Sequence, residues 1–153
     1  MASLHLLKSD SGMALPWSVF PIVKDVTIIG RGRGREPGLD IQLPAFYVGR
    51  REAKITRDRS TYVLEHLANR INATWVFAKQ SASPKKLALF PGKQHVLNDG
   101  DIILIGDYRF VFCLWADDAT GYIDDFISEV RSRWEKYCES TPRMPDEIGS
   151  GQP

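Results

Sequence analysis

The sequence is poor in the residues that build metal centres and disulfide frameworks. It has two cysteines, Cys113 and Cys138, and three scattered histidines among 153 residues. None stands at a spacing typical of metal ligands, so we expect no metal site and no structural need for a disulfide. The longest apolar runs are far shorter than the roughly 20 residues of a membrane span, and no export signal is apparent. These absences favour a reducing compartment, the cytoplasm or, in a eukaryote, the nucleus.

Catalytic patterns are also lacking. The glycine-rich run Gly30–Arg35 has neither the Gly-Lys-Ser/Thr ending of a phosphate-binding loop nor a following helix. Ser60, Ser81 and Ser83 have no evident histidine partner, and the pairs Asp117-Asp118 and Asp124-Asp125 are neighbours that do not face one another. We therefore predict a protein that is not an enzyme and needs no cofactor.

Charge is unevenly distributed although the net charge is only +1. Residues 24–93 hold 14 Lys and Arg against 6 Asp and Glu, whereas residues 94–153 hold 5 against 12. The middle of the chain is thus basic and the end is acidic. A basic body predicts an anionic partner, or docking of the acidic part onto it.

Short β-type runs alternate with turn residues over the first 116 positions, which predicts an all-β sandwich. The expected strands are Leu4–Leu7, Ser18–Ile22, Val26–Ile29, Ile41–Gln42, Ala53–Arg57, Thr61–Glu65, Trp75–Phe77, Leu87–Leu89, Gln94–Val96, Asp101–Ile105 and Arg109–Leu114.

The character of the chain changes after Trp115. Apolar residues recur at helical spacing from Ile123 to Tyr137, and Thr120 is a suitable N-cap. We predict an amphipathic helix over 117–139 and a disordered tail over 140–153. The apolar stripe is interpreted either as packing on the sandwich or as contacting a partner or a second copy.

Four phrases in the chain resemble the forkhead-associated (FHA) family, and they occur in the family's order. They are Thr27–Arg31, the segment Asp40–Ile55, Asn72-Ala73-Thr74 and Leu97–Asp107. The resemblance covers roughly residues 1–116. It implies an eleven-stranded β-sandwich with its recognition loops at one end, and a module that reads phosphothreonine.

The resemblance also implies roles for single residues. Arg31 matches the arginine that contacts the phosphorylated peptide, where its guanidinium supplies charge-assisted hydrogen bonds. Asn72 matches the asparagine that holds the peptide backbone. Gly49 stands where the family has a serine that donates to the phosphate. Losing such a bond weakens binding by about 10–100-fold.

Two further positions depart from the family pattern. Glu52 replaces a histidine that braces the loops from behind; its carboxylate needs donors, such as Arg50 and Arg51, and repels phosphate if it faces the pocket. Ala73 replaces a glycine. In addition, His66-Leu67 matches the Asp-Leu that opens the family's next phrase, but Asn72 follows one residue later than usual.

Three interpretations follow from these departures. In the first, the domain binds a partner protein without the usual phosphothreonine recognition. In the second, arginines replace the lost donors and an altered phosphopeptide or acidic peptide binds. In the third, the basic face binds nucleic acid. The candidate binding residues are Arg31, Gly49, Arg50, Arg51, Arg70, Asn72 and Thr74, with Arg33 and Arg35 as possible loop contacts.

Overall fold

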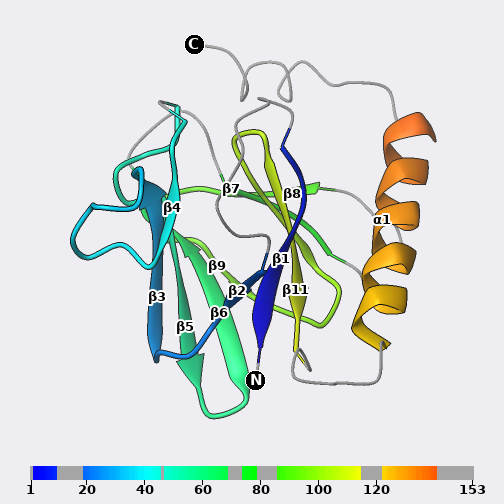
Figure 1. Ribbon diagram of the computed structural model, residues 1–153, viewed down its shortest axis with the longest axis horizontal. Helices are drawn as coiled ribbons and strands as arrows, with labels where there is room; N and C mark the ends of the chain where they lie inside the picture. The colour runs from blue at the N-terminus through cyan, green and yellow to red at the C-terminus, as the bar shows by residue number, and fades with distance from the viewer. Residues whose placement is uncertain are drawn as a thin grey trace.

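The structure is a computed structural model, and it describes residues 2–9, 19–45, 47–68, 74–78, 86–114 and 122–140. Its strands form two sheets that face each other, with one helix beside them (Figure 1). The fold class predicted from the sequence, an eleven-stranded sandwich with a C-terminal helix, is confirmed.

One sheet has six strands in the order β2-β1-β11-β10-β7-β8. Their bounds are β1 Ser3–Ser9, β2 Val19–Pro21, β7 Thr74–Phe77, β8 Lys86–Leu89, β10 Ile102–Ile105 and β11 Tyr108–Cys113. All neighbouring pairs in this sheet are antiparallel, and the register between β1 and β11 shifts between Leu6 and Lys8.

The other sheet has five strands in the order β4-β3-β5-β6-β9. Their bounds are β3 Val26–Arg31, β4 Ile41–Leu43, β5 Ala53–Asp58, β6 Thr61–His66 and β9 Gln94–Val96. Strand β4 runs parallel to β3, so the chain between them must travel back along the sheet before β4 begins. This return path is the exposed loop that carries the arginine-glycine run.

The expected strands all form, and their ends move by no more than two residues. Strand β3 extends beyond the predicted Ile29 because Gly30 and Arg31 pair with Gln42 and Leu43 of β4. Pairing with an additional strand cannot be predicted from the local alternation of apolar and polar residues. The extension matters for the site, since it fixes the backbone of Arg31 in a sheet.

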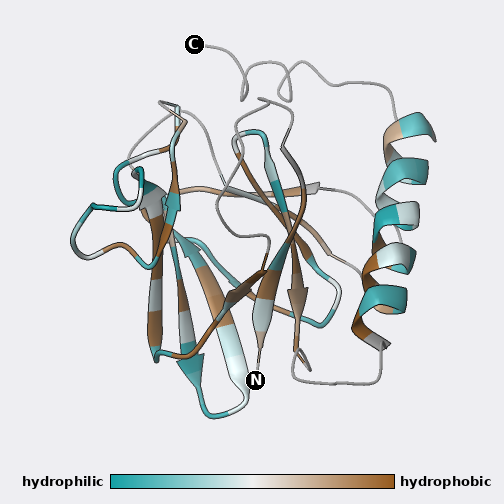
Figure 2. Ribbon diagram, in the orientation of Figure 1, coloured by the Kyte–Doolittle hydropathy of each residue, from teal (hydrophilic) through white to brown (hydrophobic). Residues whose placement is uncertain are grey.

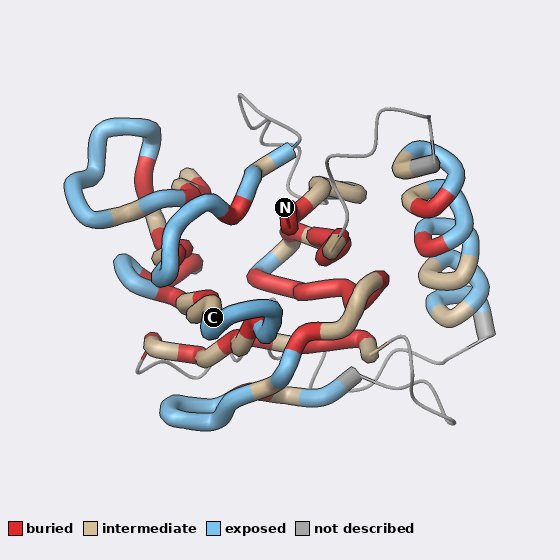
Figure 3. Tube along the Cα trace, turned by 90° about the horizontal axis from the view of Figure 1, so that it is seen from below, coloured by how far each residue is buried: buried red, intermediate tan, exposed pale blue. Residues whose placement is uncertain are grey.

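Apolar side chains of both sheets fill the space between them. The largest fully buried members are Tyr108, Phe110, Phe112, Leu4, Ile22, Ile29, Leu43, Ile55, Leu64, Leu89, Ile102 and Ile103. Figure 3 shows these strands as mostly buried and the connecting loops as exposed. A rigid core of this kind holds the loops at its ends in fixed relation to one another.

The phrase Leu97–Asp107 has a structural role. Asp101 is fully buried, and its Oδ2 accepts from the backbone N of Asn98 at 2.9 Å and lies 2.9 Å from Nε2 of His95. Gly100 has φ of 91° and donates to the Phe112 carbonyl at 2.8 Å. The phrase therefore makes the turn that leads into the central strand β10.

Helix α1 spans Tyr122–Ser140 and covers the outer face of the six-stranded sheet (Figure 1). Its apolar side faces the sheet and its hydrophilic side faces away (Figure 2). The ring of Phe77 lies 5.3 Å from that of Trp134 and 4.6 Å from that of Tyr137. The predicted apolar stripe is thus covered within this chain, as the first of its two interpretations proposed.

Several sequence predictions for this end of the chain are not tested by the structure. Thr120 and residues 141–153 lie outside the described part, so the N-cap and the disordered tail stay predictions. In the described helix, Asp124 and Asp125 lie in the first turn, where the positive end of the helix dipole favours acidic side chains, and no basic residue lies in the last turn. The basic residues of the helix stand further back, where Arg133 pairs with Glu129.

Both cysteines are free, with Cys113 buried and Cys138 exposed. Burial, followed by the charge of Asp99, raises the pKa of the Cys113 thiol to about 12. The side chain therefore behaves as a small apolar core residue. Within the described ranges, no helix is both long and apolar enough to span a membrane.

Candidate binding site at the loop end

The end of β3 and the loop between β4 and β5 meet through their backbones. The Arg31 N–H donates to the Gly49 carbonyl at 2.9 Å, and Gly32 N donates to the Leu43 carbonyl at 3.1 Å. A Cβ on Gly30 would lie 2.0 Å from the Arg50 carbonyl oxygen, so only glycine allows this approach. The structure thus brings three of the candidate residues, Arg31, Gly49 and Arg50, close together.

The change at Gly49 involves more than the absence of a serine hydroxyl. The residue is buried, and a Cβ built on it would lie 2.8 Å from the Cβ of Ala68. Its backbone N–H donates inward to Oε1 of Glu52 at 3.0 Å. At this position, therefore, the space for a side chain is already occupied and the backbone donor is used inside the protein.

Glu52 is buried, with 4% of its surface exposed, and it lies behind the loop. Its Oε2 lies 3.2 Å from Nδ1 of His66, while its carbonyl accepts from the N–H groups of Leu67 and Ala68 at 2.9 and 3.2 Å. Glu52 thus joins the β4–β5 loop to the end of β6. The sequence had suggested Arg50 and Arg51 as its donors, but both arginine side chains are exposed.

His66 and Thr74 complete this buried cluster. Both are fully buried, and Nδ1 of His66 lies 2.8 Å from Oγ1 of Thr74. Burial lowers the pKa of His66 below its usual value, and the backbone of Ala68 partly offsets this effect. Thr74, one of the candidate binding residues, lies inside the protein beside His66.

A second contact that anchors the β4–β5 loop was not predicted from the sequence. The Tyr47 hydroxyl donates to Oδ2 of Asp107 at 2.6 Å, and the Tyr47 ring occupies the space beside Gly106. A Cβ on Gly106 would lie 2.5 Å from this ring. The contact joins positions that are 60 residues apart, so no local pattern signals it. It ties the loop to the β10–β11 turn.

The arginine-glycine loop between β3 and β4 is organised by Gln42. Its Oε1 accepts from Gly34 N at 2.6 Å and from Glu36 N at 3.3 Å, and its Nε2 donates to the Glu36 carbonyl at 3.3 Å. The loop is mostly hydrophilic and exposed (Figures 2 and 3). These hydrogen bonds give it a defined course that the sequence did not predict.

Four exposed arginines extend from the two loops: Arg33, Arg35, Arg50 and Arg51. None has an ion-pair partner among the described residues. Arg70, Asn72 and Ala73, also singled out in the sequence, lie outside the described part of the chain. The candidate site therefore comprises a buried brace and an exposed cationic surface, which we call the arginine surface.

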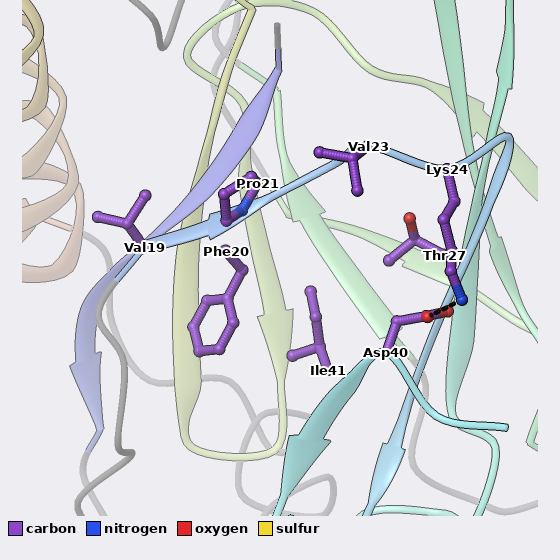
Figure 4. A pocket seen from close by; sticks show the side chains of 8 residues that line it. All are labelled: Val19, Phe20, Pro21, Val23, Lys24, Thr27, Asp40 and Ile41. Carbon is purple, nitrogen blue, oxygen red and sulfur yellow. Dashed lines mark hydrogen bonds and ion pairs between the residues drawn. The ribbon is translucent and has the colours of Figure 1, made fainter. Parts of the chain in front are cut away.

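An open groove of about 510 Å³ lies elsewhere, between the edge strands β2 and β4 (Figure 4). Apolar side chains line most of it, including Phe20 and Ile41, and the Lys24–Asp40 ion pair at 2.7 Å closes one side. Burial raises the pKa of Asp40, but hydrogen bonds from Lys24 and from Ile28 N outweigh it, so the pKa lies below its usual value. Asp40 thereby fastens the start of β4 to β3.

The model of the FHA domain family matches residues 27–106. No curated protein matches the sequence.

Several solved structures are similar. EmbR of Mycobacterium tuberculosis, in complex with a low-affinity phosphopeptide, is 28% identical with a TM-score of 0.53, over 76% of this chain and 25% of that chain. The FHA domain of FhaA, complexed with the intracellular domain of Rv3910, is 25% identical with a TM-score of 0.50. The match covers 73% of this chain and 99% of that chain. The FHA domain of human APLF, in complex with an XRCC1 bisphospho peptide, is 19% identical with a TM-score of 0.54. The match covers 73% of this chain and 96% of that chain, and it shows the fold alone.

Proposed function

The chain belongs to the FHA domain family, and on that premise we propose that it binds its partner without the usual phosphothreonine recognition. FHA domains are non-enzymatic protein-interaction modules that usually bind phosphothreonine peptides. The proposal concerns how this member differs from that usual role.

The observation that carries the proposal is the position of Gly49. A phosphate needs several convergent donors, since it presents three acceptor oxygens and nearly two charges. Gly49 has no hydroxyl, its N–H is engaged by Glu52, and Ala68 fills the adjacent space. Two donors that a phosphate would otherwise meet at this position are thus missing.

Titration with a phosphothreonine peptide library beside its unphosphorylated twin tests the proposal. We expect no preference for phosphate, in the wild type or in Arg31→Ala. Arg57→Ala serves as a control, because Arg57 pairs with Asp25 at the opposite end of the sandwich. Micromolar binding that depends on phosphate, is lost in Arg31→Ala and is kept in Arg57→Ala would refute the proposal.

A second candidate is recognition of an acidic peptide, phosphorylated or not, by the arginine surface. It is favoured by four exposed guanidinium groups on two anchored loops, with no acidic partner among the described residues. Arginine suits this role because its planar fork binds carboxylate and phosphate in two-point contacts.

The double variant Arg50→Gln/Arg51→Gln tests this candidate, with Arg131→Gln on the exposed side of helix α1 as the control. A glutamate-rich peptide should bind the wild type, weaken steeply with salt and bind the double variant at least about 10-fold more weakly. If the glutamate-rich peptide binds the double variant and the Arg131→Gln control with equal affinity, the arginine surface is excluded as its binding site.

A further inference from the structure

A tight turn between β8 and β9 lies at the same end as the candidate site. Its four residues are Phe90, Pro91, Gly92 and Lys93, and Lys93 N donates to the Phe90 carbonyl at 2.9 Å. Proline at the second position and glycine with φ of 83° at the third match a type II turn. The turn is therefore well defined by its own residues.

The turn is linked to the brace behind the β4–β5 loop. Gly92 N donates to the His66 carbonyl at 3.3 Å, while the His66 side chain lies 3.2 Å from Glu52. Glu52 in turn accepts from Gly49, the neighbour of Arg50. Moreover, Leu89, just before the turn, pairs with Thr74 at the start of β7. One continuous set of contacts thus holds the turn and the arginine surface in fixed relation.

The aromatic side chain of Phe90 on this turn is unusually exposed. It is 56% exposed, and it is the only aromatic among the large exposed apolar residues that the structure describes. Lys93 on the same turn is also exposed. Aromatic side chains beside cationic ones are typical anchors of protein interfaces, because they bury much area at a small cost in side-chain entropy.

We infer that Phe90 and Lys93 extend the arginine surface, and that the partner is an acidic segment carrying an apolar side chain that packs on Phe90. Charge complementarity identifies this partner, since these loops carry five exposed cations. The exposed acids on the described part of the same loops are Glu36 and Asp40, and Asp40 is paired with Lys24. The inference rests on the second proposed function, recognition of acidic peptides.

The test uses labelled peptides and fluorescence anisotropy with the full chain. One peptide carries only a run of glutamates, and a series adds one leucine at increasing distance from that run. At one spacing, leucine should tighten binding by about tenfold. Phe90→Ser should abolish this gain and leave the affinity for the glutamate peptide unchanged, because Phe90 is exposed and contributes little to the core.

Val23→Ser is the matched control, because Val23 is 61% exposed and lines the groove between β2 and β4. Binding of the glutamate peptide with no gain from leucine at any spacing would overturn the inference and leave the arginine surface standing. A leucine gain that survives Phe90→Ser but is lost in Val23→Ser would move the apolar contact to the groove and also overturn it. Absence of binding to every peptide would refute the acidic-peptide function itself.

Discussion

Oε2 of Glu52 lies 3.2 Å from Nδ1 of His66 inside the protein, directly behind the loop that carries Gly49. In the family phrases that the sequence resembles, the first of these positions holds a histidine and the second an aspartate. Relative to those phrases, acid and base stand in exchanged positions here. In this chain their contact joins the β4–β5 loop to the end of β6.

The first prediction concerns variants that restore the family's residue types at Glu52 and His66. Glu52→His alone places two imidazoles together, and His66→Asp alone places two carboxylates together, so each should cost about 2 kcal/mol or more of unfolding free energy. The double variant should recover at least about 1 kcal/mol relative to the sum of the single changes. Urea unfolding of all four proteins measures this coupling.

The control for this cycle is the exposed pair Glu129 and Arg133 on helix α1. Its coupling should be no more than about 0.5 kcal/mol, because solvent screens an exposed ion pair. Equal couplings for the two pairs would show that the buried contact does not brace the fold.

The second prediction concerns the pH dependence of stability. Burial lowers the pKa of His66 and of His5, although the charge of Asp124 partly opposes the effect on His5. The unfolded chain therefore binds protons that the native state excludes, and stability should fall as the pH drops below about 6.5. Each histidine can contribute a slope of up to about 1.4 kcal/mol per pH unit.

Unfolding free energies measured between neutral and mildly acidic pH check this dependence. His5→Gln and His66→Gln should each flatten the slope, and the double variant should flatten it further. A slope that is the same in all four proteins would contradict the assignment of these two histidines.

The third prediction follows from the contact between Gly49 and Ala68. Gly49→Ser should cost about 1–3 kcal/mol, because its Cβ would lie 2.8 Å from that of Ala68. Adding Ala68→Gly should relieve this clash and create room for the hydroxyl. The double variant should then bind a phosphothreonine peptide about 10–100-fold more tightly than the wild type does.

Ala68→Gly alone is the control, since it opens space without adding a donor. Peptide affinity should stay at the wild-type level in this variant. If the double variant folds well and still shows no preference for phosphate, the position of Gly49 does not account for the missing recognition.

The fourth prediction concerns Gln42, which holds the arginine-glycine loop. Gln42→Ala should raise the hydrogen-exchange rates of the Gly34 and Glu36 amides by about tenfold, as the loss of a net hydrogen bond of about 1 kcal/mol implies. Gln94→Ala removes a comparable exposed hydrogen bond, to Glu65, and should leave both amides unchanged. Unaltered exchange in Gln42→Ala would mean that the loop does not depend on this side chain.

Much of the fold could be predicted because its signals are local. Nearly continuous apolar runs next to Gly-Asp turns mark strands such as β10 and β11, and helical spacing from Ile123 to Tyr137 marks α1. The course of the β3–β4 loop could not be predicted, because it depends on a single glutamine whose hydrogen bonds are set by the parallel pairing of β4.

The candidate site was predictable only in part for a similar reason. Family phrases placed Arg31, Gly49 and Arg50 together, since those residues belong to the framework itself. They did not reveal that Glu52 faces His66, that Ala68 fills the space beside Gly49, or that Tyr47 bonds Asp107. These contacts join separate segments, and only packing in three dimensions determines them.

The placement of β1 has a practical consequence. It lies between β2 and β11 in the six-stranded sheet, yet β1, β2 and β11 all fall outside residues 27–106. A fragment excised at those limits would lose half the strands of one layer, together with the buried rings of Phe110 and Phe112. Any shortened version for binding work must therefore start before Ser3 and continue past Cys113.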